Sequence, residues 1–184
     1  MKDIHILGIS GSLREKSYNT AALRLAAELA PDGVKIMLAD ISAIPLYNDD
    51  VRHEGLPQSV VSLGEQIATA DAVLIATPEY NYSIPGVLKN AIDWLSKIDP
   101  QPFSRKPLAI MSASMGMFGT ARSQYDLRKV FVSLNAYVLN QPEVLIASAH
   151  ARFDAEGNMT DEKTRELIGQ QVVALKEWAL RLQD

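Results

Sequence analysis

Apolar and polar residues follow two different periods along this chain. Short apolar runs at residues 4–9, 34–38, 72–76, 108–111 and 144–147 have the length and composition of strands. Between them, apolar side chains recur every three or four residues, as they do on one face of a helix. The pattern predicts alternating strands and helices, which is typical of a parallel sheet covered by helices on both faces.

The strands differ in polarity, and this difference predicts their order. Residues 72–76 are apolar on both faces, which indicates a central strand. Residues 34–38 alternate in polarity, which indicates a half-exposed edge strand. We therefore predict an α/β fold, a doubly wound sheet of five parallel strands in the flavodoxin-like order 2-1-3-4-5, with helices on both faces. The length of 184 residues suits a single domain, 1–184.

Helix-forming residues and apolar stripes predict the helices between the strands. Helices are expected over residues 19–30, 58–70 and 85–95, around residues 127–134, and in a last segment whose stripe runs from Ile168 to Leu182. Residues 40–57 follow neither period. We expect them to form a long loop that is functional or makes contacts.

Composition narrows the chemistry. The chain has no cysteine, which excludes disulfides, iron–sulfur clusters and thiolate catalysis, so redox work needs a bound cofactor. His5, His53 and His150 have no metal-binding spacing, and no metal is expected. The net charge of −4 argues against a nucleic-acid partner. No apolar run approaches the ~20 residues of a membrane span, so we expect no membrane partner and a cytoplasmic protein.

A loop rich in hydroxyl groups follows the first predicted strand. A phosphate binds where hydroxyl, amide, N–H and guanidinium donors converge at a helix N-terminus. Glu15 is expected to face solvent. An N-capping cluster is the plainer interpretation, but a cap needs only one such residue. The candidate phosphate-binding residues are Ser10, Ser12, Arg14, Ser17, Asn19 and Thr20.

Three well-known motifs do not match this loop. Residues 8–13 read Gly-Ile-Ser-Gly-Ser-Leu, which is not GxGxxG, and the P-loop lysine is missing. A nucleophile elbow requires glycine where Ser12 stands. Hydrolase chemistry at Ser10 is a remote alternative, because no motif places a histidine beside it.

An aromatic loop follows the third predicted strand. It contains Pro78, Glu79, Tyr80, Asn81 and Tyr82. The tyrosines suit the faces or edges of a flat heterocycle, although surface tyrosines on a turn are an equally good interpretation of this loop alone. Asn81 tolerates the left-handed backbone that turns amides inward. Ligands of such sheets bind beyond the carboxyl ends of strands at the point where strand order reverses, so the two loops together predict bound FMN.

These segments bring the chain close to a known family. Residues 11–20, 77–86 and 88–94 resemble the NADPH-dependent FMN reductases, in particular the bacterial quinone, chromate and azo-dye reductases. The resemblance covers nearly the whole chain. It implies that the hydroxyl-rich loop holds the FMN phosphate and that Pro78, Glu79, Tyr80 and Asn81 line the isoalloxazine. It also implies a third wall made of Ser112, Ser114, Gly116 and Gly119, with glycines that let the backbone approach the ring.

The resemblance also implies an assembly. Family members are commonly homodimers or homotetramers with FMN near a subunit boundary, and the loop at residues 44–50 is expected to reach toward a neighbour's site. Arg122 and Glu143 are weaker candidates for polar contacts at an interface. An ordinary solvated charge is at least as good an interpretation of both residues.

The implied activity is transfer of hydride from NADPH or NADH to bound FMN. Two electrons then pass to small-molecule acceptors such as quinones, azo or nitro compounds, or metal oxyanions such as chromate. The flavin carries this chemistry, so no catalytic side chain is assigned. Two alternatives stay open: a flavodoxin-type electron carrier that binds FMN without direct reduction by NAD(P)H, and an α/β interaction module without a ligand.

Overall fold

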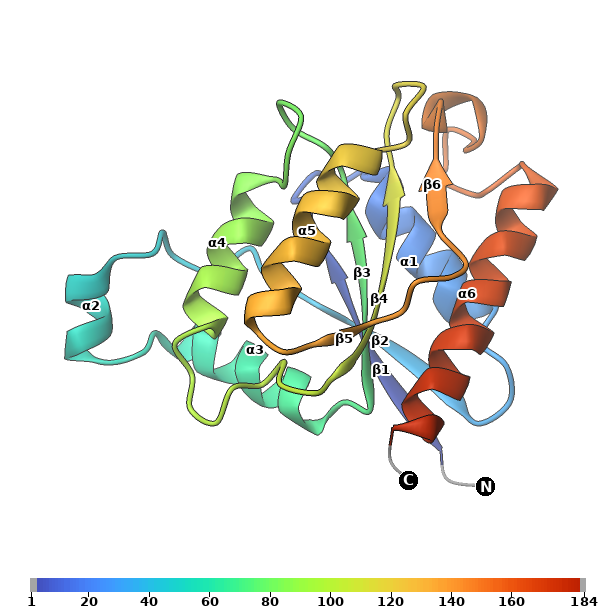
Figure 1. The fold of residues 1–184 in the computed structure, drawn as a ribbon. Coiled ribbons are helices and arrows are strands. Elements are labelled where there is room, and N and C mark those ends of the chain that lie inside the picture. Colours follow the sequence, from blue (N-terminus) through green and yellow to red (C-terminus); the bar gives the residue numbers. More distant parts are fainter. Residues whose placement is uncertain (1–2, 183–184) are drawn as a thin grey trace.

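The computed structural model describes residues 3–182 and shows the predicted alternation of strands and helices (Figure 1). A single 3-10 turn, Ala149–Ala151, precedes the last helix. The strands are β1 (Ile4–Ser10), β2 (Val34–Ala39), β3 (Ala72–Thr77), β4 (Pro107–Ala113), β5 (Tyr137–Val138) and β6 (Val144–Ile146). The helices are α1 (Tyr18–Glu28), α2 (Asp49–Glu54), α3 (Gln58–Thr69), α4 (Gly86–Leu95), α5 (Ala121–Ser133) and α6 (Glu162–Arg181).

The sheet is parallel, and the predicted strand order is confirmed as β2-β1-β3-β4-β5. The fifth position is divided between two short strands. β5 pairs with the start of β4, where Leu108 lies opposite Val138, and β6 pairs with its end, where Ala113 lies opposite Ile146. The predicted strand at 144–147 therefore corresponds to only half of this position.

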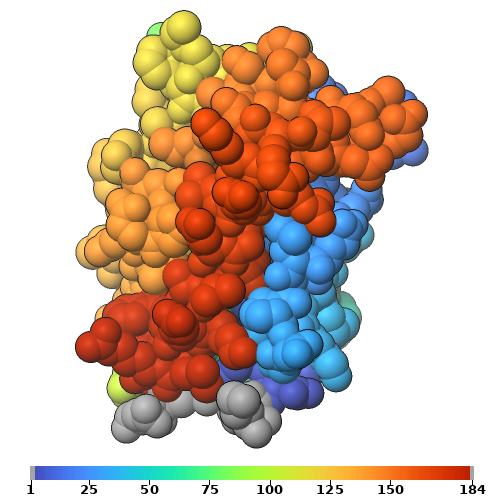
Figure 2. Space-filling model, turned by 90° about the vertical axis from the view of Figure 1, so that its right-hand side faces the viewer, coloured from blue at the N-terminus to red at the C-terminus, as the bar shows by residue number. Residues whose placement is uncertain are grey.

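Two separate cores cover the two faces of the sheet. Successive strand residues point to opposite faces, so Leu74 packs into the core with α1 and α6, while Val73 and Ile75 pack into the core with α3, α4 and α5. Figure 1 shows these helix layers on either side of the strands, and Figure 2 shows α6 (red to orange) beside the blue segment that includes α1. Every residue of β3 is buried, as predicted for the central strand. At the edge strand β2, by contrast, Met37 is 68% exposed.

The segment 40–57 contains a short helix that the sequence pattern did not predict. No residue of α2 is buried, and Asn48 caps the helix by accepting a hydrogen bond from the Asp50 N–H at 2.9 Å. The segment is attached to α4 at Pro45, whose carbonyl accepts bonds from Asn90 Nδ2 at 2.8 Å and Trp94 Nε1 at 2.9 Å. Beyond this attachment α2 projects away from the sheet (Figure 1).

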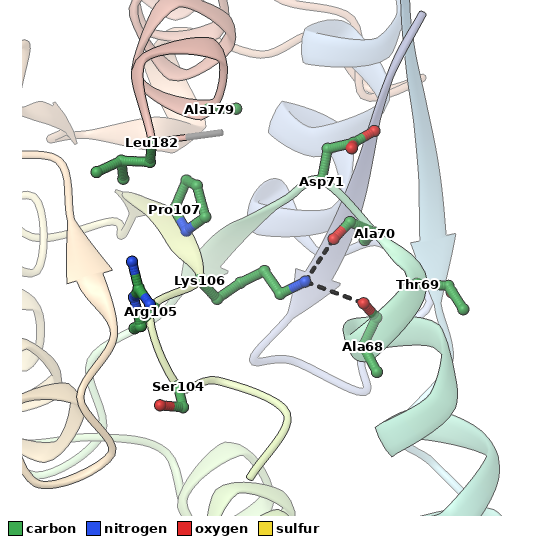
Figure 3. A pocket seen from close by; sticks show the side chains of 10 residues that line it. All are labelled: Ala68, Thr69, Ala70, Asp71, Ser104, Arg105, Lys106, Pro107, Ala179 and Leu182. Atoms are coloured by element: carbon green, nitrogen blue, oxygen red, sulfur yellow. Dashed lines mark hydrogen bonds between the residues drawn. The ribbon is translucent and has the colours of Figure 1, made fainter. Parts of the chain in front are cut away.

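A hollow at the amino ends of the strands contains a lysine with a structural role. Lys106 lines this hollow, and its Nζ donates to the carbonyl oxygens of Ala68, at 3.1 Å, and of Ala70 (Figure 3). Both carbonyl groups lie at the C-terminal end of α3. Such a contact satisfies helix carbonyls that have no partner within the helix. Burial lowers the pKa of the Lys106 ammonium group. No helix among residues 3–182 is long and apolar enough to cross a membrane.

Candidate functional site

The hydroxyl-rich loop between β1 and α1 is folded onto itself. Ser10 Oγ lies 2.8 Å from Thr20 Oγ1 and accepts a bond from the Ser12 N–H at 3.3 Å. Ser12 Oγ accepts from the Arg14 N–H, also at 3.3 Å. Ser17 is the N-cap of α1, with its hydroxyl accepting from the Thr20 N–H. The hydroxyls of the predicted phosphate loop are thus brought together by their own hydrogen bonds.

The same loop retains donors for an anion. Within residues 3–182, no hydrogen bond uses the N–H groups of Tyr18 and Asn19, the first residues of α1. The Arg14 side chain is exposed and forms no ion pair with any of residues 3–182. Glu15 is exposed, as expected. Arg14 lines a hollow of about 370 Å³ together with Ser10, Ser12 and Thr20. Backbone donors, a free guanidinium group and the positive end of a helix dipole fit a phosphate group.

The structure gives the Asn19 side chain different partners from those expected. Its carboxamide is buried, donates to the Ala113 carbonyl at 3.0 Å and accepts from the Ala113 N–H at 2.8 Å. These bonds join the start of α1 to the end of β4. We therefore assign the Asn19 side chain to positioning of the loop, while its backbone N–H remains available to a ligand.

The aromatic loop after β3 contains a tight turn. Tyr80 and Ser83 exchange two backbone hydrogen bonds of 3.1 Å, and the residues between them have positive φ angles, 50° at Asn81 and 69° at Tyr82. Two central residues with positive φ define a type I′ turn. Within residues 3–182 the N–H groups of Asn81 and Tyr82 form no hydrogen bond. Asn81 adopts the left-handed backbone that its residue type tolerates, and the turn offers two amides to a ligand.

The Glu79 carboxylate joins this loop to α5. It accepts from Arg122 Nε at 2.6 Å and from the Ser123 N–H at 3.3 Å. Thr120, the N-cap residue of α5, forms no capping bond with its own side chain, so Glu79 supplies the negative charge that the helix N-terminus favours. Arg122 is therefore a partner in an ion pair within the chain, which sequence analysis missed because the two residues lie far apart in sequence. Glu143, the other residue considered for polar contacts at a subunit interface, is half-buried.

The predicted third wall is held mainly by its own contacts. Ser112 is buried, donates to the Gly119 carbonyl at 2.7 Å and accepts from Gln124 Nε2 at 2.8 Å. Gly119 has φ 54°, and a Cβ there would lie 2.9 Å from the Leu145 carbonyl carbon. This glycine is required for packing against β6, which differs from the expected approach to a ring.

The remaining two residues of this wall lie at its rim. Ser114 Oγ donates to the Gly116 carbonyl at 3.4 Å. A Cβ added at Gly116 would meet only Ser114 Oγ, at 3.8 Å, so no steric contact requires glycine there. The exposed side chains of Met115, Met117 and Phe118 surround these positions. This part of the loop is open to a ligand.

The three loops meet at one edge of the sheet. Ser10 lies opposite Ala76 and Thr77 lies opposite Ser112, so the loops leave neighbouring strands at the same level (Figure 1). A Cβ at Gly11 would lie 3.2 Å from Thr77 Oγ1, which shows how closely the first two loops approach. Strand order reverses at β1 and β3, the position where flavodoxin-like proteins bind FMN. Fold and site together define a mononucleotide-binding α/β protein whose donors fit FMN.

Comparison with known proteins gives the family. The family model for NADPH-dependent FMN reductase matches residues 4–151, and the chain belongs to this family. It is 60% identical over 180 residues to the NAD(P)H-dependent FMN reductase PA1204 of Pseudomonas aeruginosa, covering 98% of this chain and 97% of that protein. It is 42% identical over 182 residues to the quinone reductase of Escherichia coli, covering 97% of each.

A solved structure supports the same assignment. The flavoenzyme NAD(P)H:(acceptor) oxidoreductase FerB of Paracoccus denitrificans superposes with a TM-score of 0.86 at 35% identity, covering 97% of this chain and 98% of that one. The predicted fold, family and cofactor class are confirmed: this protein is an oxidoreductase that depends on FMN and NAD(P)H.

Proposed function

We propose that this protein binds FMN across the loops that follow β1, β3 and β4 and reduces small-molecule quinones with NADPH or NADH. The observation that carries the proposal is that three sets of groups meet at one sheet edge, made up of exposed rings and of donors that have no partner among residues 3–182. These are the Arg14 guanidinium with the first amides of α1, the Asn81 and Tyr82 amides, and the exposed face of Tyr80.

The phosphate is assigned to the first loop. Arg14 and the N–H groups of Tyr18 and Asn19 donate to it, and Ser10, Ser12, Ser17 and Thr20 supply hydroxyl groups at close range. The bonds among these hydroxyls hold the loop in shape before the phosphate arrives. Charge-assisted bonds from a guanidinium group are about twice as strong as neutral ones, so Arg14 makes the largest single contribution among the side chains.

The ring is assigned to the other two loops. The amides of Asn81 and Tyr82 donate to its polar edge, Pro78 and the backbone of Glu79 line it, and Tyr80 flanks it. The loop at residues 112–119 forms the wall beyond. When bound, FMN supplies the redox chemistry, accepting hydride from the nicotinamide and delivering two electrons to the acceptor. The protein aligns the ring, leaves one face open and stabilises developing negative charge with backbone donors. No side chain is assigned as a general acid or base.

The rim of the site suits flat apolar acceptors. Tyr80 is 47% exposed, and Met117 and Phe118 are exposed by 78% and 60%. Such side chains stack on or cover an aromatic acceptor, which agrees with the quinone reductase name of the Escherichia coli relative. The same open face would admit azo and nitro compounds, and metal oxyanions such as chromate would react by electron transfer without stacking.

The projecting segment 40–57 supports a proposed homodimer or homotetramer. Leu46 is 86% exposed and Val51, on α2, is 40% exposed, and both lie on a segment that extends away from the sheet. Exposed apolar residues on such an arm suit contact with a second copy of this chain. We place the protein in the cytoplasm, without a nucleic-acid or membrane partner.

Anaerobic mixing of the FMN-loaded protein with NADPH tests the activity. We expect the flavin absorbance near 450 nm (about the usual position of the flavin band) to bleach within seconds and to return when a quinone is added. Persistent yellow colour over minutes would refute the reductase assignment and favour an electron carrier. Repeating the experiment with NADH measures the preference between the two donors.

The location of the site is tested separately. Arg14→Gln is expected to weaken FMN binding by about 1–3 kcal/mol, because it removes a charge-assisted bond to the phosphate. Quenching of FMN fluorescence by the FMN-free protein measures this affinity. Unchanged affinity would remove Arg14 from the site.

A further inference from the structure

We propose that Arg122 is a positioning residue for FMN binding, because its guanidinium group clamps the tyrosine turn, residues 80–83, to α5 and to the loop after β4. The proposal rests on the proposed placement of FMN against that turn. Arg122 donates no bond to the turn's backbone and acts through the side chains of Tyr82 and Glu79.

The guanidinium group contacts two aromatic rings from different loops. Its central carbon is 3.8 Å from the ring centroid of Tyr82 and 4.9 Å from that of Phe118. Tyr82 belongs to the turn after β3, and Phe118 to the loop after β4. Cations attract the faces of aromatic rings at such distances, and a flat guanidinium group also stacks on them. Arg122 therefore joins both loops assigned to the isoalloxazine.

A second contact fixes the position of Arg122 itself. Its Nε donates to Glu79 Oε1 at 2.6 Å, and the Glu79 side chain is only 9% exposed while that of Arg122 is 38% exposed. Because Glu79 also accepts from the Ser123 N–H, the ion pair is fastened to the first turn of α5. The same guanidinium group is thus bound to Glu79 and in contact with the Tyr82 ring.

The turn needs such a restraint at Tyr82. This residue has φ 69°, a left-handed conformation that a bulky side chain adopts only when its surroundings impose it. Tyr82 is 71% exposed, so packing in a core does not impose the conformation. The two backbone hydrogen bonds between Tyr80 and Ser83 close the turn, and two contacts with α5 then restrain it: the ring contact of Tyr82 with Arg122, and the bond that the Ser83 hydroxyl donates to Asp126 at 2.9 Å. Releasing Tyr82 would turn its amide, and that of Asn81, away from the ligand.

The clamp predicts that charge alone does not replace arginine. Arg122→Lys keeps the positive charge beside Glu79 but loses the flat surface that stacks on Tyr82. Arg122→Gln removes both contacts. Tyr82→Leu removes the ring while leaving Arg122 with Glu79. Arg165→Gln, on α6 across the sheet, serves as the matched control for loss of a positive charge.

The experiment measures FMN affinity of the FMN-free variants by fluorescence quenching and the visible circular dichroism of the bound flavin, with urea unfolding as a check on folding. We expect Arg122→Gln and Arg122→Lys to weaken binding about tenfold, equal to about 1.4 kcal/mol, and to change the flavin dichroism. The variant that combines Arg122→Gln with Tyr82→Leu is expected to bind FMN about as well as Tyr82→Leu alone. The control Arg165→Gln is expected to bind FMN like the parent protein.

Two results would overturn the clamp. If Arg122→Lys has the same FMN affinity and flavin dichroism as the parent protein, a positive charge alone suffices to position the turn. Independent, additive losses from Arg122→Gln and Tyr82→Leu would show that Arg122 does not act through the ring. Arg14→Gln separates this inference from the FMN site as a whole. If Arg14→Gln binds FMN more weakly and Arg122→Gln binds it like the parent protein, only the clamp is refuted. If both variants bind FMN like the parent protein, the proposed site is refuted as well.

Discussion

The clearest prediction concerns the buried link between α1 and β4. Asn19→Ala removes two hydrogen bonds, of 3.0 and 2.8 Å, and leaves the N–H and carbonyl groups of Ala113 without these partners. A buried polar group that loses its partner destabilises a protein by about 1–3 kcal/mol, and partial hydration of the vacated space reduces the total for two groups to about 2–4 kcal/mol. We expect this loss of unfolding free energy in the FMN-free protein.

Urea unfolding without and with FMN measures the effect. A contact between the Asn19 amide and the phosphate would leave the FMN-free protein unchanged and reduce only the stabilisation that FMN adds through binding. The exposed Asn140 provides a control, because Asn140→Ala should change stability by less than about 0.5 kcal/mol. An Asn19→Ala effect as small as that of the control, in the absence of FMN, would refute the structural role of the Asn19 side chain.

Three further outcomes follow from single contacts. Gly119→Ala should lower the unfolding free energy by about 1–3 kcal/mol, because its Cβ would lie 2.9 Å from Leu145, and an unchanged urea midpoint would contradict this. The hydroxyl and N–H of Thr164 hold the pKa of Asp161 below its ordinary value of 3.8, so the stability gained is present above that pH and lost below it. The difference in thermal midpoint between the parent protein and Asp161→Asn should therefore shrink between about pH 7 and about pH 3. Tyr80→Ala should alter the flavin spectrum or turnover more than stability, since Tyr80 is 47% exposed, and the reverse ranking would make it a packing residue.

The sheet could be predicted from sequence because the burial of each strand determines its own pattern of apolar and polar residues. The apolar run of β3 and the alternation in β2 record how many faces of each strand are covered. β5 has only two residues, both half-buried, and Pro142 lies between it and β6, so no continuous apolar run marks the fifth position. α2 was missed because a helix of six residues with no buried side chain has no apolar stripe.

The candidate site was predictable in position but not in its internal contacts. Parallel strands bring their carboxyl ends to one edge, so the three loops could be located from the strands alone. The partners within them could not be predicted, because Asn19 binds Ala113 and Glu79 binds Arg122 across long stretches of sequence. Gly119 shows the same limit, since the backbone that requires it belongs to β6.

The hydrogen bonds that close the loop at residues 10–20 have a kinetic consequence. Because the loop is ordered by its own side chains, its conformational entropy is lost when the chain folds, and little is left to lose on encounter with a mononucleotide. Capture of FMN by the empty protein should then be a one-step association whose observed rate rises linearly with FMN concentration, without a slow rearrangement phase.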